Sequence, residues 1–491
     1  MLKEYTAPDL PQDSGELKTA LKSAQARLAA QQQLIREAKL PVIVLVEGWA
    51  AAGKGTLINK LISEMDPRFC SLFSQDRVQE ADRYPFLYPW FNAIPENGKF
   101  LFMDAGWAWD TVSRKVNGEL NGEEYASRLE SLRLFERTLR DNGYVLVKLF
   151  LHISEKEQRK RIEELLEDKD TAWRVSEDDL QQNKDYEQYF EEYDSFLEQN
   201  GDIFPWTVLD GSSKKGTYLQ AFQTITQTVD AALAFGKVNA PAYEAEFPMT
   251  ETPLLRDADL SACVPEKEYK KELKRLQKKL AKQHNKIYRR RIPVVIAYEG
   301  WDAAGKGGNI RRVAYPLDPR GFDVYPIASP EPHELARHYL WRFWERLPRS
   351  GHVAIFDRTW YGRVMVERLE GYCTENDWQR AYNEINEFER ELANAGTVVL
   401  KFWIQIDPET QLQRFNDRQN TPEKQWKITE EDWRNRDKWP QYEEAISEML
   451  AKTSTTYAPW HIIESVDKKY ARLKVLRIIT DALEDALEAA D

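Results

Sequence analysis

The sequence contains few cysteines and no long apolar run. Its three cysteines, Cys70, Cys263 and Cys373, form no CxxC pair and have no histidine nearby at metal-ligand spacing. A disulfide framework or a structural zinc site is therefore not expected. No apolar segment reaches the roughly 18 residues of a membrane-spanning helix, and residues 1–16 lack the apolar stretch of a signal peptide. These absences predict a protein of the reducing cytoplasm that has no membrane partner.

Positive charge is also in short supply. The sequence has 69 Lys and Arg residues against 81 Asp and Glu, a net charge of −12, and it has no basic tail or arm. Nucleic acid is therefore not an expected partner. An acidic chain that binds phosphate must gather its cations locally, because its overall field repels anions. The 491 residues are too many for one ordinary core, and the length indicates roughly two to four domains.

One pattern occurs twice in the chain. The segment PVIVLVEGWAAAGKGT begins at Pro41, and PVVIAYEGWDAAGKGG begins at Pro293. Lys54 matches Lys306 at an offset of 252 residues, and later landmarks match at offsets of 253 and 254. So constant an offset over several landmarks indicates a tandem duplication.

Each half alternates apolar strands with helical stretches. An amphipathic helix is expected at 15–38 and at 266–289, and each is followed by a buried strand and a glycine loop. Further strands are expected in both halves, at 144–153, 206–210, 397–406 and 460–464 and before Asp104 and Asp357. This alternation predicts an α/β fold in which each half has a parallel sheet flanked by helices.

The two halves predict two domains joined by a linker. Residues 237–265 contain four prolines and show no periodicity, which is typical of a linker. We therefore expect an N-terminal domain at 1–236 and a C-terminal domain at 266–491. The duplication further suggests that the halves form an internal pseudo-dimer, and a homodimer of the whole chain is a second expectation.

The second glycine loop, from Gly300 to Lys306, has the phosphate-binding spacing G-x-x-x-x-G-K between a strand and a helix. In such a loop the backbone N–H groups and the helix N-terminus bind phosphate oxygens, and the lysine neutralises their charge. The simpler alternative is a glycine-rich turn with a surface lysine. The phosphate-binding candidates are Gly300, Ala303, Ala304, Gly305, Lys306, Gly307 and, in the following helix, Arg311.

The loop departs from the usual motif after its lysine. Gly307 and Gly55 stand where a Ser or Thr normally helps to hold Mg²⁺. Hard cations take oxygen ligands, and the nearest carboxylates are Asp302, inside the loop, and Asp357, at the end of an apolar strand. We expect these two to hold Mg²⁺, or Mn²⁺ in its place. The alternative for Asp302 is that it caps the following helix. Ala50 replaces Asp302 in the first half.

Three arginines follow Asp357. Arg358, Arg363 and Arg368 could line a route for an anion, since guanidinium groups match phosphate oxygens. For the last two the alternative is a solvated helix face with neighbouring glutamates as partners. In the first half Ala105 stands in the place of Arg358.

Residues 414–439 mix seven Arg or Lys residues with three Trp. Thr429 followed by Asp432 predicts a helix that starts with a capping box. A mobile helical hairpin here would close over phosphates and exclude water. The alternative is an exposed amphipathic helix.

The motifs EGWDAAGKGG, FDRTWYGRVMVERL and QWKITEEDW together resemble the polyphosphate kinase 2 family. The resemblance implies a P-loop kinase-like α/β fold with a helical lid in each half, and a reaction in which inorganic polyphosphate phosphorylates a nucleotide. Duplicated chains form a subgroup of that family that phosphorylates AMP to ADP with the C-terminal half.

For particular residues, the resemblance implies catalytic roles in the loop and at the second strand, polyphosphate contacts beyond it, and a contact from the lid. The loop residues are Asp302 and Lys306, and the residues at the second strand are Asp357 and Arg358. The polyphosphate contacts are Arg363 and Arg368, and the lid contact is Lys427. The first half departs from the family pattern at Ala50 and Ala105, so we expect it to be degenerate.

The expected activity is transfer of the terminal phosphate of polyphosphate to AMP. Two enzymatic alternatives remain at this point: ADP or GDP as the acceptor, and an ATP-dependent nucleoside monophosphate kinase. A P-loop protein that binds nucleotide without turnover is a third alternative, which would suit the first half better than the second.

Overall fold

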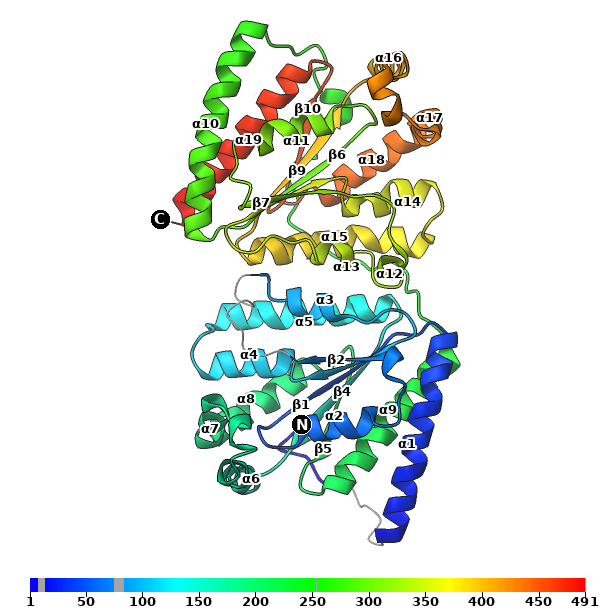
Figure 1. Ribbon diagram of the computed structural model, residues 1–491, viewed down its shortest axis with the longest axis vertical. Coiled ribbons are helices and arrows are strands. Elements are labelled where there is room, and N and C mark those ends of the chain that lie inside the picture. The colour runs from blue at the N-terminus through cyan, green and yellow to red at the C-terminus, as the bar shows by residue number, and fades with distance from the viewer. Residues whose placement is uncertain (8–13, 75–83, 253, 491) are drawn as a thin grey trace. The chain divides into compact units, whose positions relative to one another are not determined.

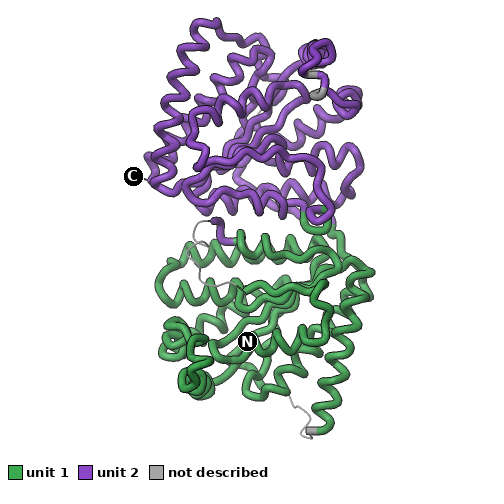
Figure 2. Tube along the Cα trace, viewed as in Figure 1, with its two compact units in different colours: residues 1–78, 87–240, 335–338 green, residues 79–86, 241–334, 339–491 purple. Residues whose placement is uncertain are grey.

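The computed structural model describes residues 1–7, 14–74, 84–252 and 254–490, apart from the side chains of residues 14, 424, 426 and 427. The chain divides into two compact units (Figure 2). Unit 1 consists of residues 1–78, 87–240 and 335–338, and unit 2 consists of residues 79–86, 241–334 and 339–491.

Unit 1 is built on a five-stranded parallel sheet with the order β2-β3-β1-β4-β5. Its central strands are mainly apolar and buried because helices cover both faces of a parallel sheet. The strands are β1 (Val42–Gly48), β2 (Cys70–Ser74), β3 (Phe100–Asp104), β4 (Val145–His152) and β5 (Trp206–Asp210).

Unit 2 repeats this topology in the order β10-β9-β6-β8-β7. In register, Tyr298 lies opposite Asp357, so β6 and β8 end side by side. The strands are β6 (Val294–Gly300), β7 (Phe322–Pro326), β8 (Val353–Asp357), β9 (Val398–Gln405) and β10 (Trp460–Glu464).

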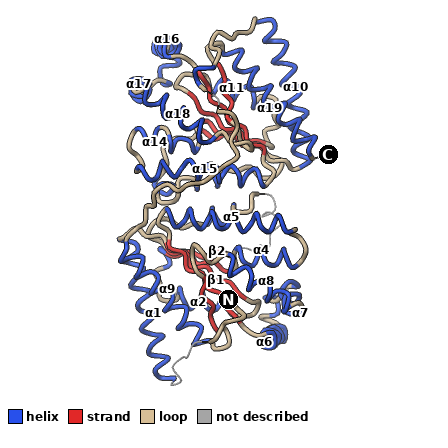
Figure 3. Tube along the Cα trace, turned by 180° about the vertical axis from the view of Figure 1, so that it is seen from behind, coloured by secondary structure: helices blue, strands red, loops and turns tan. Residues whose placement is uncertain are grey.

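The helices of unit 1 cover both faces of its sheet (Figure 3). Helices α1, α2 and α9 pack on one face, and α4 and α5 pack on the other. The helices are α1 (Ser14–Glu37), α2 (Lys54–Ile62), α3 (Tyr88–Ala93), α4 (Trp107–Val116), α5 (Gly122–Asp141), α6 (Glu155–Glu167), α7 (Glu177–Lys184), α8 (Tyr186–Gln199) and α9 (Lys214–Phe235), with 3₁₀ turns η1 (Pro67–Phe69) and η3 (Ala172–Arg174).

Unit 2 has the same two layers, with α10, α11 and α19 on one face and α15 and α18 on the other. In Figure 1, α16 and α17 stand away from these layers, near the carboxyl ends of the strands. The helices are α10 (Glu266–Arg290), α11 (Lys306–Ala314), α12 (Pro332–Leu335), α13 (Trp341–Trp344), α14 (Val366–Leu369), α15 (Glu375–Asn394), α16 (Pro408–Gln419), α17 (Glu430–Asp437), α18 (Trp439–Thr453) and α19 (Lys468–Ala489), with 3₁₀ turns η4 (Leu255–Asp257), η5 (Trp360–Val364) and η6 (Pro422–Lys427).

The predicted fold, a duplicated parallel sheet flanked by helices, is confirmed. The sequence analysis missed the two edge strands, β2 and β7. Each has only five residues, and none of them is buried. A strand at the edge of a sheet needs no continuous apolar run, so the apolar pattern that revealed the central strands is absent there.

In its described residues, the segment predicted as a linker, 237–265, has no α-helix; it contains the short turn η4 and an isolated β-bridge from Met249 to Thr455. From Pro241 onwards it belongs to unit 2. The N–H of Thr250 donates to the carbonyl of Ser454 at 2.8 Å, and the side-chain amide of Asn383 donates to the carbonyl of Tyr243 at 2.7 Å. Most of this segment is therefore fastened along unit 2.

The cysteines and the apolar segments of the chain bear on disulfides and on membrane insertion. The three cysteines are free thiols. Within the described ranges, no helix combines the length and the apolar character needed to cross a bilayer.

Candidate active site

The phosphate loop of unit 2 connects β6 to α11. It opens with Gly300, where a Cβ atom would lie 2.6 Å from the carbonyl oxygen of Ile404, so the close approach of β9 requires glycine. Ala303 and Gly305 have positive φ angles of 60° and 111°. Gly305 is the N-cap of α11 and has no side-chain cap, which leaves the N–H groups of Lys306 and Gly307 in the first helical turn for a ligand. Asp302 therefore does not cap this helix, and that alternative is wrong.

Lys306 begins α11 and folds back over the loop. Its ammonium donates to the carbonyl oxygen of Gly300 at 2.6 Å. The loop also contains a buried carboxylate, Glu299, which accepts the N–H of Thr359 at 2.7 Å and its hydroxyl at 2.8 Å. Burial raises the pKa of Glu299, although the nearby charge of Lys306 opposes the shift. Glu299 thus joins the loop to the turn that follows β8.

Asp302 and Arg358 meet above this connection. Nη2 of Arg358 lies 3.7 Å from Oδ1 of Asp302, and the Arg358 side chain is 53% exposed while that of Asp302 is 16% exposed. Arg358 has a φ of 67°, and its N–H donates to the carbonyl of Tyr298 at 3.0 Å. The long ion pair and the exposed guanidinium leave Arg358 able to turn toward an anion.

Asp357 lies at the carboxyl end of β8, half-buried, beside Arg358. No described residue donates a hydrogen bond to its carboxylate. A Cβ at Gly307 would meet nothing within 4 Å, so the position of the missing hydroxyl residue is open.

The candidate metal ligands at this edge of the sheet are the carboxylates of Asp302 and Asp357. Within the described ranges, no group of three His, Cys, Asp or Glu side chains is placed to hold an ion. Mg²⁺ is commonly bound by one or two carboxylates together with water and substrate phosphates. Asp302, in the loop after β6, and Asp357, at the end of the neighbouring strand β8, fit that mode.

The predicted lid segment forms α16, η6 and α17 and leads into α18. Thr429 and Asp432 form the predicted capping box, with reciprocal bonds of 2.7 and 3.4 Å. The side chain of Lys427, the expected lid contact, lies outside the described part of the structure. Trp439, at the start of α18, stacks on Trp301 of the loop with ring centroids 3.5 Å apart.

The lid is hydrogen-bonded to the phosphate loop through Asp302. The side-chain amide of Asn435 donates to Oδ2 of Asp302 at 3.0 Å. Gln411 donates to the Asp302 carbonyl at 3.2 Å, and Arg436 donates to the side-chain oxygen of Gln411, also at 3.2 Å. One carboxylate is therefore shared between the lid and Arg358.

Arg414, in α16, binds the backbone carbonyls of the phosphate loop. Its guanidinium donates to the carbonyls of Ala303 and Ala304, both at 2.9 Å, and to the carbonyl of Ser465 at 2.5 Å. Burial, aided by the charge of Arg418, lowers the pKa of Arg414 to about 10. Because the carbonyls of Ala303 and Ala304 point at Arg414, the N–H groups of Ala303 and Gly305 can point the other way, whereas the N–H of Ala304 donates to the carbonyl of Trp301 at 3.1 Å.

The three remaining arginine candidates are not gathered at the loop. Arg311 is exposed on α11. Arg363 pairs with Glu367 at 3.1 Å, the partner that the alternative named, but its side chain is only 16% exposed and so does not lie on a solvated face. Arg368 pairs with Glu448 at 2.6 Å and lies over the ring of Trp378.

Unit 1 has the same loop backbone without the same side chains. Ala51 and Gly53 have positive φ angles of 57° and 95°, as their counterparts do. Where Asp302 would stand, Ala50 donates its N–H to the side-chain oxygen of Gln182 at 2.8 Å. Ala105 has a φ of 55° and takes the place of Arg358.

The sequence analysis missed four residues that shape this site: Glu299, Gln411, Arg414 and Asn435. Glu299 was visible, because both copies of the motif contain the same EGW triplet, matched by Glu47. Arg414 and Asn435 match Arg161 and Gln182 at the offset of 253. That alignment alone does not reveal which loop atoms these side chains bond.

Known proteins match this chain in both of its halves. A model of the polyphosphate kinase 2 family matches residues 12–235 and again residues 264–490. A polyphosphate:AMP phosphotransferase of Pseudomonas aeruginosa is 39% identical over 476 residues, which cover 96% of each chain. A protein of the same name from Acinetobacter johnsonii is 37% identical and covers 90% of each chain.

A crystal structure from Pseudomonas aeruginosa PA01, assigned to polyphosphate kinase 2, superposes with a TM-score of 0.84 at 36% identity and covers 99% of both chains. Sequence and structure therefore agree over almost the whole length, in both repeats. The chain belongs to the polyphosphate kinase 2 family, with one P-loop kinase-like repeat in each half.

Proposed function

We propose that this protein transfers the terminal phosphate of inorganic polyphosphate to AMP, giving ADP, and that unit 2 catalyses the reaction. The observation that carries the proposal is the meeting of Asp302, Arg358 and Asn435 at the unit 2 loop. Relatives that match the chain from end to end are named polyphosphate:AMP phosphotransferases, which supports AMP as the acceptor.

Phosphoryl transfer depends on alignment and charge neutralisation more than on covalent chemistry by the protein. The backbone N–H groups of the loop at Gly300, Ala303, Gly305 and Gly307 orient the phosphates of the donor, while the N–H of Ala304 donates to the carbonyl of Trp301. Lys306 is already anchored beside them through Gly300. Arg358, exposed and only loosely paired with Asp302, neutralises the charge that spreads over the transferring group.

Asp302 and Asp357 would hold Mg²⁺, or Mn²⁺, with the remaining positions filled by phosphate oxygens and water. When bound, the ion would neutralise negative charge on the phosphates. Asn435 donates to Oδ2 of Asp302, so the lid contacts one of the two carboxylates that would hold the ion.

Beyond the phosphate loop, the rest of the polyphosphate chain would contact the arginines and the lysine that lie farther from the loop. Arg363 and Arg368 each pair with one carboxylate, and a guanidinium has five N–H donors, so each retains donors for an anion. Arg311 and the lid residue Lys427 complete this set. We place the reaction in the cytoplasm, in keeping with the free thiols.

A product assay tests the proposal. Polyphosphate is supplied with AMP, ADP or GDP in turn, and ATP is supplied with AMP in parallel. We expect ADP from polyphosphate and AMP at a much higher initial rate than any other product. Faster conversion of ADP to ATP would identify the alternative acceptor, and ADP formation only with ATP would identify a nucleoside monophosphate kinase. Binding without a single turnover would contradict an enzymatic role.

A further inference from the structure

The turn after β8 holds an unfavourable backbone conformation at the residue that matters most for charge neutralisation. Arg358 has a φ of 67° although it is not glycine. Residues in this region persist only where the surrounding structure holds them. The first restraint is Glu299, which binds the N–H and the hydroxyl of Thr359.

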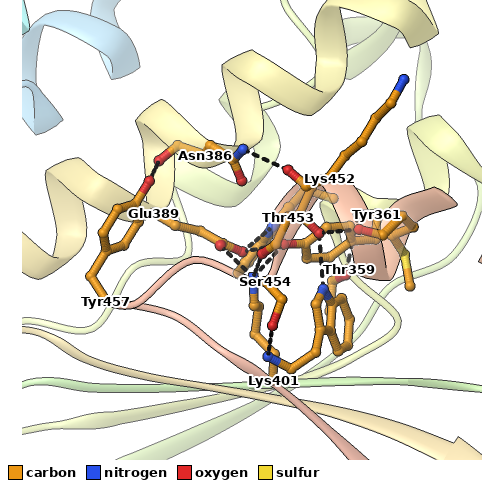
Figure 4. A network of polar contacts seen from close by, with 12 residues as sticks. Thr359, Tyr361, Asn386, Glu389, Lys401, Lys452, Thr453, Ser454 and Tyr457 are labelled. Atoms are coloured by element: carbon orange, nitrogen blue, oxygen red, sulfur yellow. Dashed lines mark hydrogen bonds and ion pairs between the residues drawn. The ribbon is translucent and has the colours of Figure 1, made fainter. Parts of the chain in front are cut away.

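A second restraint lies deeper, in the network of Figure 4. Glu389, from α15, accepts the hydroxyl of Tyr361 at 2.7 Å and the indole N–H of Trp360 at 3.1 Å. Lys401, from β9, pairs with Glu389 at 2.7 Å and donates to the Tyr361 hydroxyl, also at 2.7 Å. The side chains of Glu389 and Lys401 are both 0% exposed.

Unit 1 contains the same buried ion pair without the connection to the turn. Lys148 pairs with Glu136 at 2.9 Å, again with both side chains 0% exposed. Ala108 takes the place of Tyr361, so no hydroxyl reaches the pair. In the described part of the chain, the indole N–H of Trp107 finds no acceptor. The first restraint is kept, because Glu47 accepts the N–H of Ala108 at 3.1 Å.

Ala105 keeps a φ of 55° without this link, so the link is not needed for the backbone angle itself. The ion pair is common to both halves, and its link to the turn accompanies the arginine. We propose that Tyr361 and Glu389 are positioning residues that limit the motion of the turn, so that the guanidinium of Arg358 stays where it meets the transferring phosphate. The inference rests on the proposed function. Two side chains that directly follow the turn are fixed to a rigid, buried charge pair, which limits how far Arg358 can move.

Tyr361→Phe is the first test, because it removes one hydroxyl and leaves Lys401 paired with Glu389 and with the carbonyl of Thr453. We expect a folded protein in which kcat falls roughly tenfold, the size of effect that a small displacement of a catalytic group produces. The KM for AMP should stay within about twofold, since Arg358 acts in the transition state. An unchanged kcat in a folded variant would overturn the inference.

A double-mutant cycle with Arg358→Ala separates positioning from general stability. If Tyr361 acts through Arg358, adding Tyr361→Phe to Arg358→Ala should change kcat by less than about twofold. A further tenfold loss in that background would show that Tyr361 acts elsewhere, and it would overturn the inference. A wild-type protein that forms no ADP would instead contradict the proposed function.

The two ion pairs provide a matched control. Glu389→Gln and Glu136→Gln each leave a buried lysine without its carboxylate, so both should lower the melting temperature. Only Glu389→Gln should lower the kcat of the protein that remains folded. Equal losses of kcat would mean that the pairs act through stability alone. If neither variant folds, the Tyr361→Phe cycle decides.

Discussion

The two phosphate loops of this chain have nearly the same backbone and different surroundings. In both, a residue at positive φ precedes a glycine N-cap, and a lysine folds back onto the first glycine. In unit 2 the loop carboxylate Asp302 faces Arg358 and the lid. In unit 1 the lid amide Gln182 bonds the backbone of Ala50 instead.

The lids differ even more than the loops. Residues 414–439 contain seven Arg or Lys and six Asp or Glu, whereas the matching residues 161–186 contain four and nine. An acidic lid repels a polyanion, and a near-neutral lid with clustered arginines does not. The difference teaches that the backbone of a phosphate loop can be kept while the charged side chains around it change.

Asp302→Asn should produce the largest effect. The change keeps the size of the side chain and removes its charge, and electrostatic groups of this kind typically contribute about 10²- to 10³-fold in rate. We expect kcat to fall by that factor with little change in KM, measured as ADP formed from polyphosphate and AMP. Near-normal turnover in a variant with wild-type melting behaviour would place catalysis in the other half.

The next largest effect should appear in polyphosphate binding. Raising monovalent salt from about 50 to about 200 mM should increase the KM for polyphosphate roughly tenfold, because a few cations release counterions from the polymer. The KM for AMP should change much less. Arg434 and Gln181 occupy matching exposed positions in the two lids, so Arg434→Gln should weaken polyphosphate binding while Gln181→Arg leaves it unchanged. Equal salt dependence for both substrates would argue against a cationic track in unit 2.

Lys54→Met in unit 1 should change kcat by less than about tenfold, whereas Lys306→Met should abolish most turnover. The reason is that Lys54 serves a loop without the Asp302 and Arg358 equivalents. For the same reason, adding Ala50→Asp to the Asp302→Asn variant should restore no activity, since Ala105 and the acidic lid remain. Both are read as initial rates after folding has been checked by thermal melting. Loss of turnover in a well-folded Lys54→Met protein would break the proposed division of labour.

The smallest effect concerns stability and pH. Burial raises the pKa of Glu47 to about 7 from an ordinary value of 4.5. A raised folded pKa means that the folded state keeps its proton longer, so the free energy of unfolding falls as the pH rises from about 4.5 through 7.

Glu47→Gln removes this dependence. Its melting temperature relative to wild type should therefore be about 5–10 °C more favourable at pH 8 than at pH 5, with turnover unchanged. Glu299→Gln should share the pH trend and also lose turnover, because Glu299 binds Thr359 in the catalytic turn. If the melting temperatures of Glu47→Gln and wild type differed by the same amount at both pH values, the pKa of Glu47 would not be raised in the folded protein.

Much of the fold could be predicted from the sequence, because the central strands are continuous apolar runs and the offset of 252 to 254 residues exposes the duplication. The exposed edge strands β2 and β7 could not, since they are defined by hydrogen bonds to β3 and β8 rather than by their own composition. The capping box at Thr429 was predictable because it depends on residues only three apart.

Of the candidate site, the sequence by itself determined the loop, the paired Asp302 and Arg358 positions, and the absence of both in the first half, because motif spacing and internal repetition are local properties of the chain. Only the tertiary structure decided what these groups touch. Asn435 reaches Asp302, Arg414 binds the carbonyls of the loop, and Tyr361 connects the turn to a buried ion pair. Each contact joins residues from different elements, and such contacts depend on how helices and strands pack, which short-range sequence patterns do not encode.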